Sequence, residues 1–133
     1  MTAFIDASAV AAILLDEDDA SDLYVRMRGQ GRCMTSPLAV WEAVRAISRE
    51  RDVTVEEAHS AVERLLQIAA IEVAPVAPEV RHLAIEAHVR YGKGRHPAAL
   101  NFGDCFAYAC ARQAGVPLLY KGDDFSRTDI EPA

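Results

Sequence analysis

The sequence has few lysines, few cysteines and no long hydrophobic run. Lys93 and Lys121 are the only lysines among 14 basic residues, and 20 acidic residues bring the net charge of the 133-residue chain to −6. This balance argues against a protein held to nucleic acid or to an anionic membrane by overall charge, although a local basic patch remains compatible with it. The uncharged run at residues 7–15 is far shorter than the roughly 20 apolar residues of a membrane-spanning helix. Asp6 also interrupts the N-terminal segment, which does not suit a signal peptide.

The three cysteines are odd in number and have no CxxC spacing. This favours reduced, buried thiols in a cytoplasmic protein over a disulfide framework or a zinc site. Hydrophobic residues make up 51% of the chain, which is ordinary for a folded protein. Without repeats or a long linker, the sequence predicts one domain over residues 1–133.

Short apolar runs alternate with helical patterns along the chain. We expect strands at residues 3–6, 32–35, 71–74 and 116–120, and helices at residues 8–15, 21–28, 37–51, 54–69, 78–91 and 102–114. This alternation is typical of an α/β fold with a parallel sheet covered by helices on both faces. In such folds ligands bind at the carboxyl ends of the strands.

One helix carries apolar residues at steps of three. Leu38, Trp41, Val44 and Ile47 form this stripe in the helix predicted at residues 37–51. We interpret the stripe as a buried face, so Trp41 is expected in the core.

Five acidic residues lie at the ends of predicted elements or among apolar neighbours. Asp6 closes the first strand, Glu42 lies inside an apolar helix, Asp104 is in the first turn of a later helix, and Asp123 and Asp124 follow the last strand. Taken singly, each has a structural explanation, such as a helix cap for Asp6 or a favourable helix dipole for Asp104. Taken together, buried acids from separate elements need a cation, and all-oxygen ligands favour Mg²⁺ or Mn²⁺ over zinc.

Four motifs in order resemble one known family. They are Ile5-Asp6-Ala7-Ser8, the helix-borne Glu42, the helix start at residues 101–108, and the ending at residues 118–125. These motifs, which span nearly the whole chain, look like those of PIN-domain ribonucleases, and more narrowly of the VapC toxins of bacterial toxin–antitoxin modules. The resemblance implies a three-layer α/β/α PIN-like domain with a central parallel sheet of four or five strands. It also implies a Mg²⁺-dependent endoribonuclease, inhibited by a cognate antitoxin that covers the active site.

The resemblance also implies a role for each motif residue. Asp6, Glu42 and Asp104 would be the metal-binding acids, and we expect Asp6 and Asp104 to contact the metal directly. Asp123 and Asp124 compete for the role of a fourth catalytic acid, and the spacing does not choose between them. The Ser8 hydroxyl would support a metal ligand or a metal-bound water.

A basic loop with two glycines follows the predicted helix at residues 78–91. Arg90, Lys93 and Arg95 could bind the RNA backbone beside the acids, or the segment could be only a solvated surface loop. The resemblance further implies a homodimer, while nothing in the sequence indicates a membrane partner. Two alternatives remain open: a non-catalytic RNA- or protein-binding PIN-like module, and a Mg²⁺-dependent phosphotransfer domain. A receiver domain would use a lysine after its last strand, where Lys121 roughly fits, but it also needs paired acids near the start that this sequence lacks.

Overall fold

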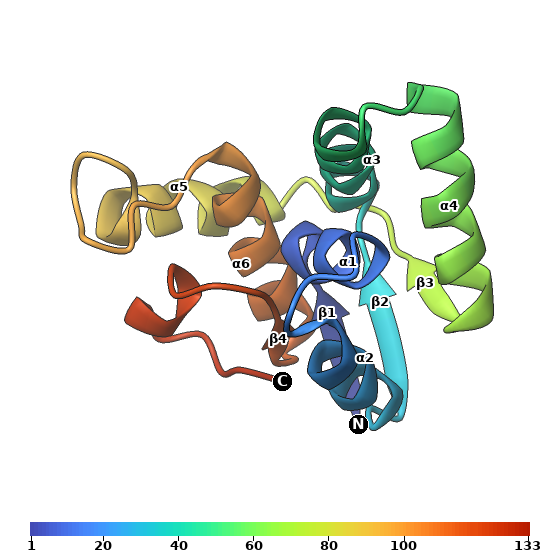
Figure 1. Ribbon diagram of the computed structural model, residues 1–133. Coiled ribbons are helices and arrows are strands. Elements are labelled where there is room, and N and C mark those ends of the chain that lie inside the picture. The colour runs from blue at the N-terminus through green and yellow to red at the C-terminus, as the bar shows by residue number, and fades with distance from the viewer.

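Four short parallel strands form one sheet in the spatial order β3-β2-β1-β4 (Figure 1). The computed structural model describes all of residues 1–133. Ala3 of β1 pairs with Cys33 of β2, and Phe4 pairs with Leu118 of β4. The strands are β1 (Thr2–Ile5), β2 (Arg32–Thr35), β3 (Ile71–Val73) and β4 (Leu118–Leu119). Because all neighbouring pairs are parallel, the carboxyl ends of the strands share one edge of the sheet.

Six α-helices connect and cover these strands (Figure 1). Their starts follow from capping side chains: Ser36 accepts a hydrogen bond from a backbone N–H of α3, and Thr54 and Glu57 form a capping box at α4. A left-handed Gly115 ends α6, where a residue without a Cβ is favoured. The helices are α1 (Ala7–Leu14), α2 (Ala20–Arg28), α3 (Pro37–Arg51), α4 (Val55–Ile68), α5 (Val80–Tyr91) and α6 (Phe102–Ala114).

Two hydrophobic cores lie on opposite faces of the sheet, as the alternation of side chains along a strand requires. Ala3 and Ile5 of β1 point into the core that packs against α1, α2, α3 and α4. Phe4, between them, points into the core formed with α5 and α6. The predicted three-layer α/β/α arrangement is therefore confirmed, with four strands in the sheet.

The C-terminal segment extends the sheet beyond β4 without forming a regular fifth strand. Leu118 makes an isolated parallel bridge to Pro132, and the Leu118 N–H donates to the Glu131 carbonyl at 2.9 Å. A 3₁₀ turn at Phe125–Arg127, which the sequence did not indicate, leads into this segment. The last strand, β4 (Leu118–Leu119), is therefore shorter than the strand predicted at residues 116–120.

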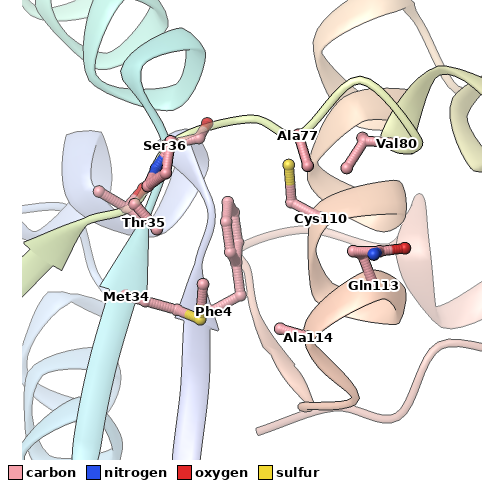
Figure 2. A pocket seen from close by; sticks show the side chains of 11 residues that line it. Phe4, Met34, Thr35, Ser36, Ala77, Val80, Cys110, Gln113 and Ala114 are labelled. Carbon is pink, nitrogen blue, oxygen red and sulfur yellow. The ribbon is translucent and has the colours of Figure 1, made fainter.

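A small cavity of about 90 Å³ lies between the sheet and α6 (Figure 2). Phe4, Met34 and Cys110 are among the side chains that line it, and none of its lining residues is acidic or basic. It lies at the edge of the second core, and its lining is mostly apolar. All three cysteines are free and buried, as predicted. None of the helices combines the length and the apolar character needed to cross a bilayer.

Candidate active site

Asp6 lies at the carboxyl end of β1, where the chain turns into α1. Its side chain is only 4% exposed and caps α1 by accepting a hydrogen bond from the Ser8 N–H at 3.0 Å. The Asp6 N–H donates to the Leu119 carbonyl at 2.9 Å, which ties the residue to the end of β4. Asp6 can therefore be both a helix cap and a site residue, because capping α1 also fixes its carboxylate at the carboxyl end of β1.

Ser8 binds the same carboxylate oxygen of Asp6 with its hydroxyl as well as with its N–H. The Ser8 hydroxyl donates to Asp6 Oδ2 at 2.5 Å and accepts from the Lys121 N–H at 3.0 Å. This hydroxyl joins α1 to the segment that follows β4. Ser8 is therefore bonded to Asp6, and its support of a metal ligand stays a prediction.

Glu42 reaches the same region from the second turn of α3, and Gly103 of α6 makes room for it. A Cβ at position 103 would lie 2.1 Å from Glu42 Oε2 and 2.3 Å from Oε1, so any larger residue would displace the carboxylate. The absence of a side chain at Gly103 therefore lets a carboxylate from α3 rest directly against the start of α6.

Asp104 belongs to the first turn of α6 and forms a capping box with Asn101. Asn101 Oδ1 accepts from the Asp104 N–H at 2.9 Å, and Asp104 Oδ2 accepts from the Asn101 N–H at 3.1 Å. One carboxylate oxygen of Asp104 is thus used to define the helix start, which fixes the orientation of the other.

Asp6, Glu42 and Asp104 all line one cleft of about 330 Å³. No ion pair links any of the three to a basic side chain within 4 Å. Nowhere in the chain do three acidic, histidine or cysteine side chains converge tightly enough to hold an ion between them unaided. The cleft is therefore an open acidic site and not a closed metal cage.

The charges of these three carboxylates affect one another. Burial raises the pKa of Asp6, against the lowering effect of its hydrogen bonds to Ser8. Burial, followed by the negative charges of Asp6 and Asp104, raises the pKa of Glu42 to about 7. Burial likewise raises the pKa of Asp104 to about 6, with further contributions from Asp6 and Asp124. The cleft concentrates negative charge that no ion pair to the three acids offsets.

Asp124 and Asp123, which the sequence could not separate, differ in their surroundings. The charge of Asp124 raises the pKa of Asp104, so Asp124 lies within electrostatic reach of the cleft. Asp123 does not affect any of the three acids in this way, and its backbone carbonyl accepts a hydrogen bond from Ser126 at 2.6 Å. Of the two, Asp124 is better placed as a fourth acid.

The predicted basic loop does not line the acidic cleft. The Arg90 guanidinium lies 3.4 Å from Asp129 and 3.7 Å from Glu86, so it already has carboxylate partners. Lys93 and Arg95 are exposed, and Lys93 lines a separate apolar groove of about 520 Å³. The contact of this loop with substrate stays a prediction.

Arg45 and Arg49 are the basic residues that line the acidic cleft, and the sequence reasoning missed them. They follow Glu42 on α3 at steps of three and four, which places all three on one face of the helix. That spacing was the signal that could have identified them.

Trp41, which is expected in the core, lies at the surface instead. It is 65% exposed and lines the cleft instead of packing in the core. Three residues turn an α-helix by only 300°, so a stripe with steps of three drifts by about 60° at each step. Ala39, Ala43 and Ile47 occupy the buried face, and Trp41 falls well to one side of it.

Comparison with known proteins agrees with this geometry. The family model described as the PIN domain matches residues 3–131. The chain belongs to the PIN-domain family. A VapC ribonuclease of Rhizobium meliloti is 38% identical over 139 aligned residues, covering 96% of this chain and 98% of the relative. Ribonuclease VapC42 of Mycobacterium tuberculosis is 40% identical over 131 residues, covering 97% of each chain.

The solved structures extend the comparison of this PIN domain to its fold. The crystal structure of Mycobacterium tuberculosis VapC20, described as a sarcin-ricin loop cleaving toxin, superposes with a TM-score of 0.76. It is 20% identical and covers 98% of each chain, so the likeness establishes the fold of this PIN domain. The family and the fold predicted from the sequence are both confirmed.

Proposed function

We propose that this PIN domain is a Mg²⁺-dependent endoribonuclease toxin that hydrolyses phosphodiester bonds of RNA at the acidic cleft. The observation that carries the proposal is the meeting of Asp6, Glu42 and Asp104, from three separate elements, in one cleft where none of them forms an ion pair. A buried Asp6 beside the half-buried Glu42 and Asp104 is a costly concentration of negative charge unless a cation is bound. Relatives named as VapC ribonucleases over nearly their full length support the same activity.

The residues of the cleft fit a hard divalent cation. Every donor is a carboxylate or hydroxyl oxygen, which suits Mg²⁺ or Mn²⁺. An open site is also appropriate, because Mg²⁺ keeps several waters and binds through one or two carboxylates. Asp6 and Asp104 would hold the ion directly, with Glu42 and Asp124 placed to bind its waters. When bound, the ion would activate a water and stabilise charge on the phosphoryl and leaving oxygens.

The protein's own groups position the substrate and the acids. Ser8 fixes the Asp6 carboxylate through its hydroxyl, and Gly103 leaves the space that Glu42 occupies. Arg45 and Arg49, on the rim of the cleft, would bind phosphate oxygens that the acids alone would repel. The phosphotransfer alternative is less well supported, because the Lys121 ammonium forms ion pairs with Glu17 and Asp19 instead of facing the acids.

We further propose a cognate antitoxin as inhibitor, a homodimer and a cytoplasmic location. These proposals rest on the similarity to VapC ribonucleases. Purification of the chain with and without the product of the neighbouring reading frame, followed by mass measurement, tests the partner and the oligomeric state together.

The nuclease is tested with Asp6→Asn and Asp104→Asn. We expect either change to reduce Mg²⁺-dependent cleavage of RNA by more than about 100-fold, with the fold kept, because each removes a charged metal ligand but leaves a hydrogen-bonding oxygen. End-mapped cleavage of a structured RNA, with and without chelator, measures the effect.

Asp18→Asn is the matched control, since Asp18 is an exposed acid outside the cleft and its change alters the net charge equally. Wild-type cleavage that persists in chelator, or full activity in both cleft variants, would contradict the proposal.

A further inference from the structure

Two large aromatic side chains stand exposed beside the acids. Trp41, directly before Glu42, is 65% exposed, and Phe102, directly before Gly103, is 71% exposed. Both line a groove of about 500 Å³ that also contains Glu42. Exposure of such large apolar surfaces is unfavourable in water, so a pair of them at a candidate active site points to a ligand that covers them.

This groove joins the acidic cleft to a third groove. It shares Trp41 and Glu42 with the cleft, and it shares Asn101 and Phe102 with the apolar groove lined by Lys93. The three hollows therefore adjoin one another in series, and together they make up a track over the surface. Along this track, cations stand at both ends, and the acids and then the two aromatics lie between them.

The order of groups along the track matches a single nucleic acid strand. Arg45 and Arg49 at one end and Lys93 at the other can bind phosphates. The aromatic middle repels no phosphate and offers flat apolar faces, on which any base can stack. Phe102 is supported from behind by Phe106, whose ring centroid lies 4.9 Å away. A paired base is already stacked inside its duplex, so only an unpaired nucleotide can use such a site.

We propose that Trp41 and Phe102 form a stacking site for an unpaired nucleobase next to the phosphate that is cleaved. This inference rests on the proposed ribonuclease function and deepens it, because it names the two side chains that would bind a base beside the cleaved phosphate. Arg45, Arg49 and Lys93 on either side of the aromatics favour RNA as the occupant, since these cations can bind the phosphates that flank a stacked base.

The chain's single tryptophan provides a direct measurement of stacking. Stacking of a base on the Trp41 indole should quench its fluorescence when an unstructured RNA oligonucleotide is added in the presence of chelator, where no cleavage occurs. We expect strong quenching by the oligonucleotide, weak quenching by the same sequence in a duplex, and none by an abasic oligonucleotide of equal length. Equal quenching by the abasic oligonucleotide would overturn the proposal, because phosphate contacts alone would then explain binding.

Substitutions test the site through cleavage kinetics. Trp41→Ala and Phe102→Ala should each raise KM about 10-fold, within the roughly 5- to 150-fold range expected for loss of one base stack, with a smaller change in kcat. Trp41→Phe and Phe102→Tyr should restore most of the lost affinity, since they keep an aromatic face. Ile68→Ala, at a residue 62% exposed on α4, is the matched control.

The outcomes separate this proposal from the ribonuclease itself. If both alanine variants cleave RNA at the wild-type rate and with an unchanged KM, the stacking site is wrong and the proposed nuclease activity is unaffected. Absence of wild-type cleavage would count against the nuclease, while quenching would still report on base binding. If Trp41→Ala instead halves the mass of the protein in solution at unchanged KM, the aromatics are covered by a second copy of the chain and the proposal is wrong.

Discussion

The acids of the cleft and Asp129 on the C-terminal segment lie in opposite electrostatic surroundings. Asp129 accepts a hydrogen bond from the Tyr108 hydroxyl at 2.5 Å and lies 3.4 Å from Arg90 and 3.6 Å from Arg112. Burial acts to raise the pKa of Asp129, but the hydrogen bond from Tyr108 and the charges of Arg112 and Arg90 outweigh it, so the pKa is lowered. In the cleft, Glu42 has no such partner and its pKa is raised to about 7.

This difference separates Asp129, whose charge is balanced by partners within the chain, from the cleft acids, whose charges no ion pair balances. Asp129 is satisfied by groups of the chain itself, and its network fastens the C-terminal segment to α5 and α6. Asp6, Glu42 and Asp104 are held just as firmly, by a cap, a glycine and a capping box, yet their charges are left unbalanced. Fixed geometry combined with unbalanced charge is the arrangement expected of a functional site.

The largest effect on stability should come from removing one charge of the cleft. The pKa of Glu42 rises from 4.5 to about 7 on folding, so the folded chain binds more protons between these values than the unfolded chain does. In chelator, the free energy of unfolding should therefore fall as the pH rises from about 4.5 to about 7. Glu42→Gln should increase the free energy of unfolding at pH 8 by about 1–3 kcal/mol and flatten this slope, as measured by urea unfolding.

Addition of Mg²⁺ should make the wild type more stable to unfolding than Glu42→Gln. The ion stabilises the wild type by binding only its folded state, and it should stabilise Glu42→Gln less. Asp18→Asn, the exposed control, should stay within about 0.5 kcal/mol of the wild type. A destabilised Glu42→Gln protein in chelator would show that the cleft neutralises its own charges and would remove the contrast with Asp129.

A smaller effect should follow from adding one methyl group at Gly103. The new Cβ would collide with the end of the flexible Glu42 side chain, so the carboxylate should move and the fold should remain. Alanine is also about 0.5–1 kcal/mol better than glycine within a helix. We therefore expect Gly103→Ala to lower kcat/KM for RNA about 10-fold at equal or greater stability.

Gly29→Ala is the matched control for this change. A Cβ there would make only ordinary contacts, 3.4 Å from the nearest backbone oxygens, and Gly29 lies outside the cleft. Loss of stability without loss of activity in Gly103→Ala would show that the glycine serves helix packing and not the placement of Glu42.

The strands, the helices and the three principal acids could be predicted because their signals are local. Asp6 follows an apolar run, Asn101 and Asp104 have capping-box spacing, and Glu42 interrupts an apolar helix. The order of strands and helices then implies a parallel sheet, whose carboxyl ends bring such residues together. The family resemblance rested on the same local motifs.

The features that could not be predicted depend on contacts between distant segments or on helix rotation. Arg90 pairs with Asp129, 39 residues away, and nothing near Arg90 in the sequence indicates this partner. Asp124, but not Asp123, acts on the charge of Asp104, and the turn after β4 decides which of the two adjacent acids does so. Apolar residues at steps of three predict a buried Trp41, but such a stripe rotates around the helix by about 60° at each step and leaves the buried face.

The smallest effect should come from Asp129, and it should have the opposite sign to that of Glu42. Asp129→Asn removes a charged acceptor from Tyr108, Arg90 and Arg112, but the side chain is 38% exposed and solvent screens the ion pairs. We expect a loss of about 1 kcal/mol in the free energy of unfolding at pH 7, with RNA cleavage unchanged. Because folding lowers the pKa of Asp129, its contribution to stability is present above the ordinary pKa of 3.8 and disappears as the pH falls through the pKa of the folded state.

Tyr108→Phe should reproduce part of this loss of stability, as it removes the hydrogen bond to Asp129 while keeping the ring. Urea unfolding at pH 7 and pH 3 measures both, and a drop in cleavage at full stability would place Asp129 among the functional acids.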